Sequence, residues 1–141
     1  MSTVVRILAA LWCGSLWSVG LLVAPTLFNT VSPTDAGRVV AVVFLYQAIG
    51  GMVAAAVMLL LDRSAAGTLL GTAGRKATLL MAVGVGLGYF ALKPLMDHGR
   101  ALLAAGQPIP AWADFGMLHG VSSAIYLLVA LLGLRLVAVV R

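Results

Sequence analysis

Four long apolar segments constrain the fold of this chain more than any other feature of its sequence. They cover residues 4–28, 39–61, 77–95 and 115–140. A helix needs about 20 mainly apolar residues to cross the hydrocarbon core of a bilayer, and in lipid its backbone groups must be hydrogen-bonded within the segment. We therefore expect an all-α, integral membrane four-helix bundle that forms one domain over residues 1–141.

Polar residues and a proline separate the four segments. A turn-forming stretch at residues 29–38 follows the first segment, Asp62 closes the second, and Arg75 with Lys76 opens the third. Pro94 is predicted to end the third helix, because proline lacks the backbone N–H that continues the hydrogen-bond ladder. The first segment is expected to remain as a span, because no small-residue cleavage site with a polar mature start follows it.

The composition fits a membrane protein and excludes other classes. Hydrophobic residues make up 62% of the chain and charged residues 9%, whereas soluble domains have about 45–50% and about 25%. The net charge of +5 and the pI of 10.2 do not indicate a nucleic-acid partner, because the nine basic residues form no cluster. Cys13 is the single cysteine, which excludes an internal disulfide. We expect membrane lipid as the surroundings and no nucleic acid.

The basic residues also predict an orientation. With four spans, both termini and the middle connection lie on one side, which carries six basic residues: Arg6, Arg63, Arg75, Lys76, Arg135 and Arg141. The other side carries Arg38, Lys93 and Arg100, offset by three acidic residues. The positive-inside rule therefore places both termini in the cytoplasm, and we expect the bacterial inner (plasma) membrane as the location.

Small residues at four-residue spacing predict close helix contacts. Gly84 and Gly88 form a GxxxG pair in the third segment. Similar small residues recur in the first and second segments: Ala10, Gly14, Ser18, Gly50, Gly51 and Ala54. We expect Trp12 and Trp17, which lie deep in the first segment, to face neighbouring helices. A homo-oligomer or a membrane-complex partner is also expected, because four short-looped helices can hardly enclose a wide pathway alone.

Polar residues concentrate toward the outer side and form the candidate ligand-binding set. Its members are His119, Ser122, Ser123, Tyr126, Gln47 and Lys93. Polar groups at membrane depth usually face protein or a water-filled cavity. One interpretation is a small outward-facing pocket that uses His119. The other is that these side chains only hydrogen-bond one helix to another, while His119 braces the adjacent loop.

A second candidate site is a metal site at the outer loop, formed by His119, His98 and Met96. Imidazole and thioether groups suit Cu(I), so haem or copper would be the cofactor. Residues two positions apart on a helix point about 200° apart, so each Met-x-His pair could hold one ion only outside a helix. The chain shows no HExxH motif, paired carboxylates or catalytic triad, so we predict no catalytic residues.

The first span contains Leu11-Trp12-Cys13-Gly14-Ser15-Leu16-Trp17 and then Val23-Ala24-Pro25, and the last contains Leu118-His119-Gly120-Val121-Ser122. In these elements the chain resembles the domain of unknown function 4149, the bacterial relatives of transmembrane protein 205. The resemblance implies a four-helix membrane protein without an established reaction, in which Trp12, Gly14, Pro25 and Gly120 are structural motif residues. The eukaryotic relatives are associated with resistance to platinum drugs, which hints at metal or small-molecule handling.

Three functions follow from these features as hypotheses. The first is a non-enzymatic binding, accessory or transport-related component of the membrane. The alternative is a haem- or metal-binding membrane protein with a site near the outer face. A third, an enzyme acting on a lipid or a quinone, rests only on the outer polar residues.

Overall fold

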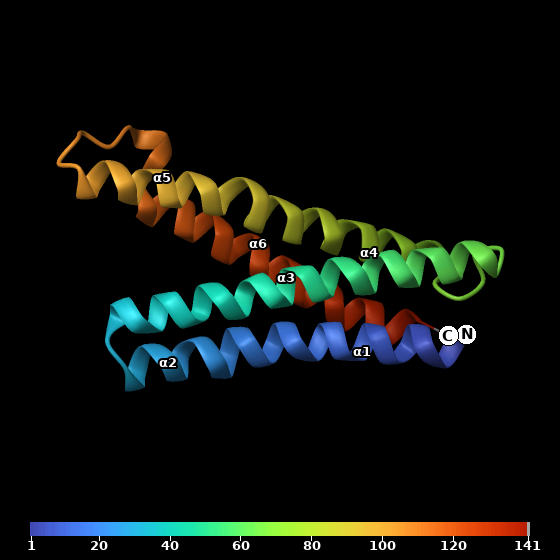
Figure 1. Ribbon diagram of the computed structural model, residues 1–141. Helices are drawn as coiled ribbons and strands as arrows, with labels where there is room; N and C mark the ends of the chain where they lie inside the picture. Colours follow the sequence, from blue (N-terminus) through green and yellow to red (C-terminus); the bar gives the residue numbers. More distant parts are fainter. Residues whose placement is uncertain (141) are drawn as a thin grey trace.

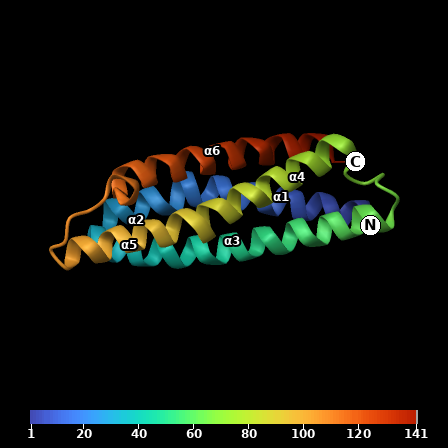
Figure 2. The ribbon, with the colours of Figure 1, turned by 90° about the horizontal axis from the view of Figure 1, so that it is seen from above.

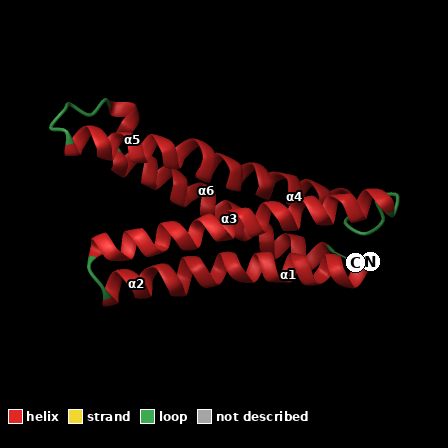
Figure 3. Ribbon diagram, in the orientation of Figure 1, coloured by secondary structure: helices red, strands yellow, loops and turns green. Residues whose placement is uncertain are grey.

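The computed structural model describes residues 1–140 and is helical throughout, with short connections and no strand in this part of the chain (Figures 1 and 3). Four helices are long and apolar enough to cross a membrane: Ser2–Thr30, Pro33–Ser64, Gly71–Ala104 and Phe115–Val139. The predicted all-α four-helix membrane bundle is thus confirmed. Each helix extends beyond or closely matches its predicted apolar segment, and the third is longer by nine residues at its C-terminal end, from residue 95 to Ala104.

Local chemistry explains where the helices begin. The second long helix, α3 (Pro33–Ser64), has a proline in its first turn, and the Ser32 side chain accepts a hydrogen bond from the Asp35 backbone N–H at 3.2 Å. The fourth, α6 (Phe115–Val139), follows a 3-10 turn η3 (Ala111–Ala113), and the Asp114 carboxylate accepts from the Met117 N–H at 2.8 Å. Both caps satisfy a backbone donor that the first helical turn leaves free.

Two of the long helices contain a wide, π-helical turn followed by proline. The first runs as α1 (Ser2–Ser18), η1 (Val19–Val23) and α2 (Ala24–Thr30). The third runs as α4 (Gly71–Gly86), η2 (Leu87–Leu92) and α5 (Lys93–Ala104). Pro25 and Pro94 each lie in the first turn after the wide segment. The prediction that Pro94 ends the third helix is therefore wrong, because the π-helical turn accommodates the missing N–H donor and the helix continues.

The chain termini and the connection between α3 and α4 lie at one end of the bundle, called the inner end here after the predicted orientation (Figure 1). The connections from α2 to α3 and from α5 to α6 lie at the outer end. Seen from above, the four long helices run side by side along one direction (Figure 2). Toward the outer end, the α2–α3 pair diverges from the α5–α6 pair (Figure 1).

The core lies in the inner half, where all four long helices meet. Its buried members include Val5, Leu16, Met58, Met81 and Leu136. In lipid, such contacts are driven by close packing more than by hydrophobic burial.

Two glycines allow close approach between these helices. A Cβ atom on Gly84 would lie 2.5 Å from Val129 Cγ2, and one on Gly51 would overlap the indole of Trp12. Other predicted packing positions make no close contact: a Cβ on Gly14, Gly50 or Gly88 would meet no atom within 4 Å. The predicted close helix contacts are thus confirmed at Gly51 and Gly84, whereas Gly14, Gly50 and Gly88 make no such contact within the described chain.

The two deep tryptophans do face neighbouring helices, as expected. Trp12 is buried, and Trp17 Nε1 donates to the Ala130 carbonyl of α6 at 3.2 Å. The Trp12 Nε1 atom is buried and has no hydrogen-bond partner among residues 1–140.

Candidate functional site

Two of the six predicted ligand-binding residues meet between α1, α3 and α6. The Tyr126 hydroxyl donates to the Leu16 carbonyl at 2.6 Å and lies 3.2 Å from Gln47 Oε1. Gln47 Nε2 donates to the Ser15 carbonyl at 2.8 Å. Because the hydroxyl has one proton, the shorter contact, to Leu16, takes it. We call Tyr126 and Gln47, with the Ser15 and Leu16 carbonyls that they contact, the polar bridge.

The polar bridge lies at the level where the first helix changes from α to π geometry. A Cβ atom on Gly20 would lie 2.8 Å from Tyr126 Cε1, so the glycine at this position lets the Tyr126 ring approach the helix backbone. The ring also packs edge-on against Phe44 of α3, with centroids 5.3 Å apart. The side chains of α3 and α6 are thus anchored on the carbonyls of α1 just below its wide turn.

The other four predicted ligand-binding residues form no hydrogen bond with the polar bridge in the described chain. His119 is exposed, and its ring stacks on Phe115 with centroids 5.4 Å apart. Ser123 Oγ donates to the carbonyl of His119 within the same helix at 2.8 Å. Ser122 is half-buried on α6, and Lys93 forms an ion pair with Asp97 one turn along α5. The structure therefore groups Tyr126 with Gln47, while the role of the full set as a ligand site stays a prediction.

The predicted metal ligands occupy separate aromatic stacks. His98 stacks on Trp112 with centroids 5.7 Å apart and 8° between the ring planes, whereas His119 lies on Phe115. Met96 is half-buried on α5. Within the part of the chain that the structure describes, no group of three or more His, Cys, Asp or Glu residues is placed to hold a metal ion. No observation therefore favours the haem or metal alternative.

The family-motif residues differ in their surroundings. Trp12 is buried in the core, and Pro25 lies in the first turn of α2, directly after the wide turn. Gly14 and Gly120 are exposed, and a Cβ atom on either would meet no atom within 4 Å.

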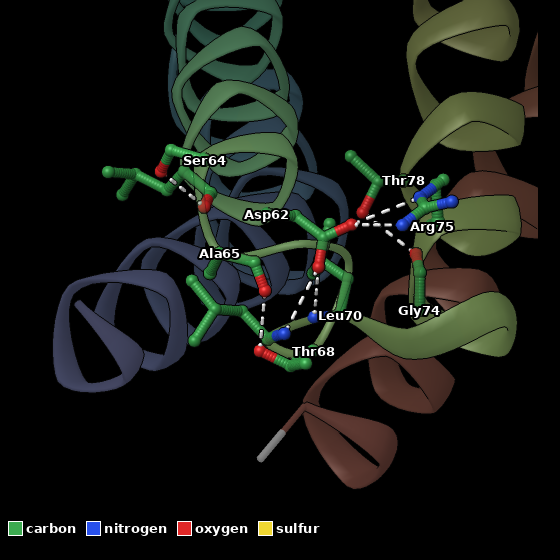
Figure 4. Close-up of polar contacts among 10 residues, drawn as sticks. Asp62, Ser64, Ala65, Thr68, Leu70, Gly74, Arg75 and Thr78 are labelled. Carbon is green, nitrogen blue, oxygen red and sulfur yellow. Dashed lines mark hydrogen bonds and ion pairs between the residues drawn. The ribbon is translucent and has the colours of Figure 1, made fainter.

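An ion pair on a buried carboxylate stabilises the inner connection, and we did not predict it from the sequence (Figure 4). Asp62, at the end of α3, is only 1% exposed. Its Oδ2 atom accepts from Arg75 Nε at 3.0 Å and Nη2 at 2.7 Å, and its Oδ1 atom accepts from the backbone N–H groups of Leu69 and Leu70 at 3.1 and 2.8 Å. One carboxylate thus joins two helices and the connection between them.

The backbone of the connection adapts to the same ion pair. Gly67 has φ +79°, and a Cβ atom at this position would overlap Arg75 Nη2. Glycine therefore supplies both the left-handed conformation and the space for the guanidinium. In the sequence, Asp62 and Arg75 lie on either side of a short, glycine-containing connection, which is compatible with an ion pair. Charged residues are also common at the ends of membrane spans, so this placement alone does not predict the pair.

The geometry defines the class of this protein: an all-helical bundle of four helices long and apolar enough to span a membrane, with a closely packed inner half and a polar bridge that joins α1, α3 and α6. The sequence pattern of the family described as Domain of unknown function (DUF4149) matches residues 7–107, so the chain belongs to that family. The Leu118-His119-Gly120 element lies outside the matched residues, and the likeness to transmembrane protein 205 stays a prediction. No curated protein and no solved structure matches the chain.

Proposed function

We propose that this protein is a non-enzymatic binding component of the bacterial inner membrane, whose ligand or partner is received between the outer halves of its helices. The observation that carries this proposal is the contrast between the two halves of the bundle. The core shared by the long helices ends near the polar bridge. In α2 and in η2, which lie above that level, no residue is buried.

Toward the outer end, the main helix contacts lie within each pair. On one side α2 packs against α3, and on the other α5 packs against α6 and η3. Gly99 of α5 approaches Ala113 of η3 so closely that a Cβ atom on it would overlap the Ala113 carbonyl. Each pair is therefore packed internally, and the pairs diverge from each other toward the outer end (Figure 1), which supports a binding region between them.

The polar bridge would form the floor of this region. Tyr126 and Gln47 offer a hydroxyl and an amide amid apolar surroundings, which suits an amphipathic molecule or a polar group on a partner helix. Binding without chemistry is supported by the absence, in the sequence, of paired carboxylates within a span and of a catalytic triad. A transport role would need further subunits, because one small bundle does not enclose a wide pathway.

A photo-crosslinking experiment tests the proposal. A benzoylphenylalanine replaces Phe44, which contacts Tyr126 at the outer side of the bridge, and in a control it replaces Leu60, which is 66% exposed on the inner half of α3. We expect a discrete adduct of defined mass from position 44 and only bulk lipid adducts from position 60. Identical bulk lipid adducts at both positions, together with native mass spectra of a bare monomer, would contradict the proposal.

A further inference from the structure

The inner end of the bundle carries a set of cations without acidic partners. Arg75 is bound to Asp62, but Arg6, Arg63, Lys76 and Arg135 form no ion pair within residues 1–140. Asp62 is the one acidic residue at this end, and it is buried. The end of the protein that meets one face of the bilayer is therefore strongly positive, and anionic headgroups are attracted to such a surface.

One of these cations lies on a groove. Between the start of α1 and the end of α6 lies an open groove whose lining includes Thr3, Arg6, Ile7, Ala10, Val137 and Val140. A second groove at the same end lies beside the α3–α4 connection, and its lining includes Gly67, Thr68, Thr72 and Val139 but no basic residue. Arg6 is thus the basic residue of this end that lines a groove.

We infer that this groove is a binding site for one anionic phospholipid, with its phosphate on Arg6 and an acyl chain along the α1–α6 seam. The guanidinium of arginine suits a phosphate because it presents a planar fork of donors, and the Thr3 hydroxyl adds a further donor. The small side chain of Ala10 and the apolar chains of Ile7 and Val137 leave an apolar path that leads away from Arg6.

The net charge of the headgroup decides which phospholipid fits. A zwitterionic headgroup carries its own cation, which would meet the positive inner end, whereas phosphatidylglycerol brings only negative charge. This inference rests on Arg6 and the inner groove and is independent of the proposed function at the outer half. If one of the two proposals is contradicted, the other is unaffected.

The test measures lipid retention by the full chain. Protein in mild detergent is titrated with phosphatidylglycerol or phosphatidylcholine, and bound lipid is counted by native mass spectrometry. We expect one retained phosphatidylglycerol and weaker binding of phosphatidylcholine. Arg6→Gln should weaken phosphatidylglycerol binding roughly three- to tenfold, the range for an exposed charge-assisted contact. Arg63→Gln, which removes an equal charge at the same end but outside the groove, should change it by less than about twofold.

A variant that keeps every charge tests the shape of the site. Ala10→Trp fills the apolar path on an exposed helix position and should weaken phosphatidylglycerol binding without altering the helix content seen by circular dichroism. Equal weakening by Arg6→Gln and Arg63→Gln would overturn the inference in favour of general charge attraction. Equal retention of both lipids, or full retention by Ala10→Trp, would also overturn it.

Discussion

Replacement of Asp62 by alanine should cost more stability than any other single change of a charged residue in the described chain. The substitution removes four hydrogen bonds to one carboxylate. The N–H of Leu70, a residue that is 2% exposed, would be left without a partner, which costs about 1–3 kcal/mol. Two other groups that lose Asp62 can hydrogen-bond to water instead: the N–H of the half-buried Leu69 and the side chain of Arg75, which is 47% exposed. Their loss of the carboxylate therefore lowers stability less. We expect a total loss of about 2–4 kcal/mol.

Two further variants separate charge from shape. Asp62→Asn keeps one oxygen for the backbone N–H groups but turns an amide NH₂ toward Arg75, so it should cost about 1–2 kcal/mol. The matched control is Asp97→Ala, because Asp97 is 47% exposed and its ion pairs with Lys93 and Arg100 lie on the surface. This control should change stability by less than about 1 kcal/mol.

The assay is unfolding in mixed micelles, in which the apparent free energy is obtained from SDS titration followed by far-UV circular dichroism. The expected order of destabilisation is Asp62→Ala, then Asp62→Asn, then Asp97→Ala. If Asp62→Ala and Asp97→Ala unfolded at the same SDS fraction, the buried carboxylate would not anchor the α3–α4 connection, and the reasoning would be refuted.

Three other changes probe the core, the polar bridge and the wide turns. Gly51→Val should lower the free energy of unfolding by about 1–3 kcal/mol, because the added side chain would overlap Trp12. The control Gly50→Val, at the exposed neighbouring position, should leave stability nearly unchanged. Equal SDS midpoints for the two variants would contradict the contact between Gly51 and Trp12. Tyr126→Phe should lower the free energy of unfolding by about 0.5–1.5 kcal/mol, because it removes one interhelical hydrogen bond. An unchanged SDS midpoint would show that the polar bridge does not stabilise the bundle. Pro94→Ala restores a backbone N–H donor, so it should raise the SDS midpoint of unfolding and slow amide hydrogen exchange in η2. Unchanged exchange would mean that the proline does not cause the wide turn.

The sequence was sufficient to predict the number, order and helical nature of the spans. Apolar length and the need to satisfy backbone groups in lipid act on each segment separately, so they can be read without knowledge of the neighbours. The prediction that Pro94 ends its helix was wrong, because a π-helical turn can accommodate the missing N–H donor. Whether such a turn forms depends on the surrounding helix and not on the proline alone. The grouping of Tyr126 with Gln47, residues far apart in the chain, could not be read from their spacing.

The chain by itself therefore determined four apolar helices, their polar breaks and their family, whereas the tertiary structure decided which face of each helix points inward. Gly50 and Gly51 show the reason: adjacent and chemically identical, one faces outward and the other lies against Trp12. A membrane helix is apolar all round, so hydropathy does not mark its inner face, and complementary shape does. Asp62 likewise became a buried carboxylate paired with Arg75 only when the α3–α4 connection covered it, because a carboxylate is stable alone in water but needs partners once it is buried.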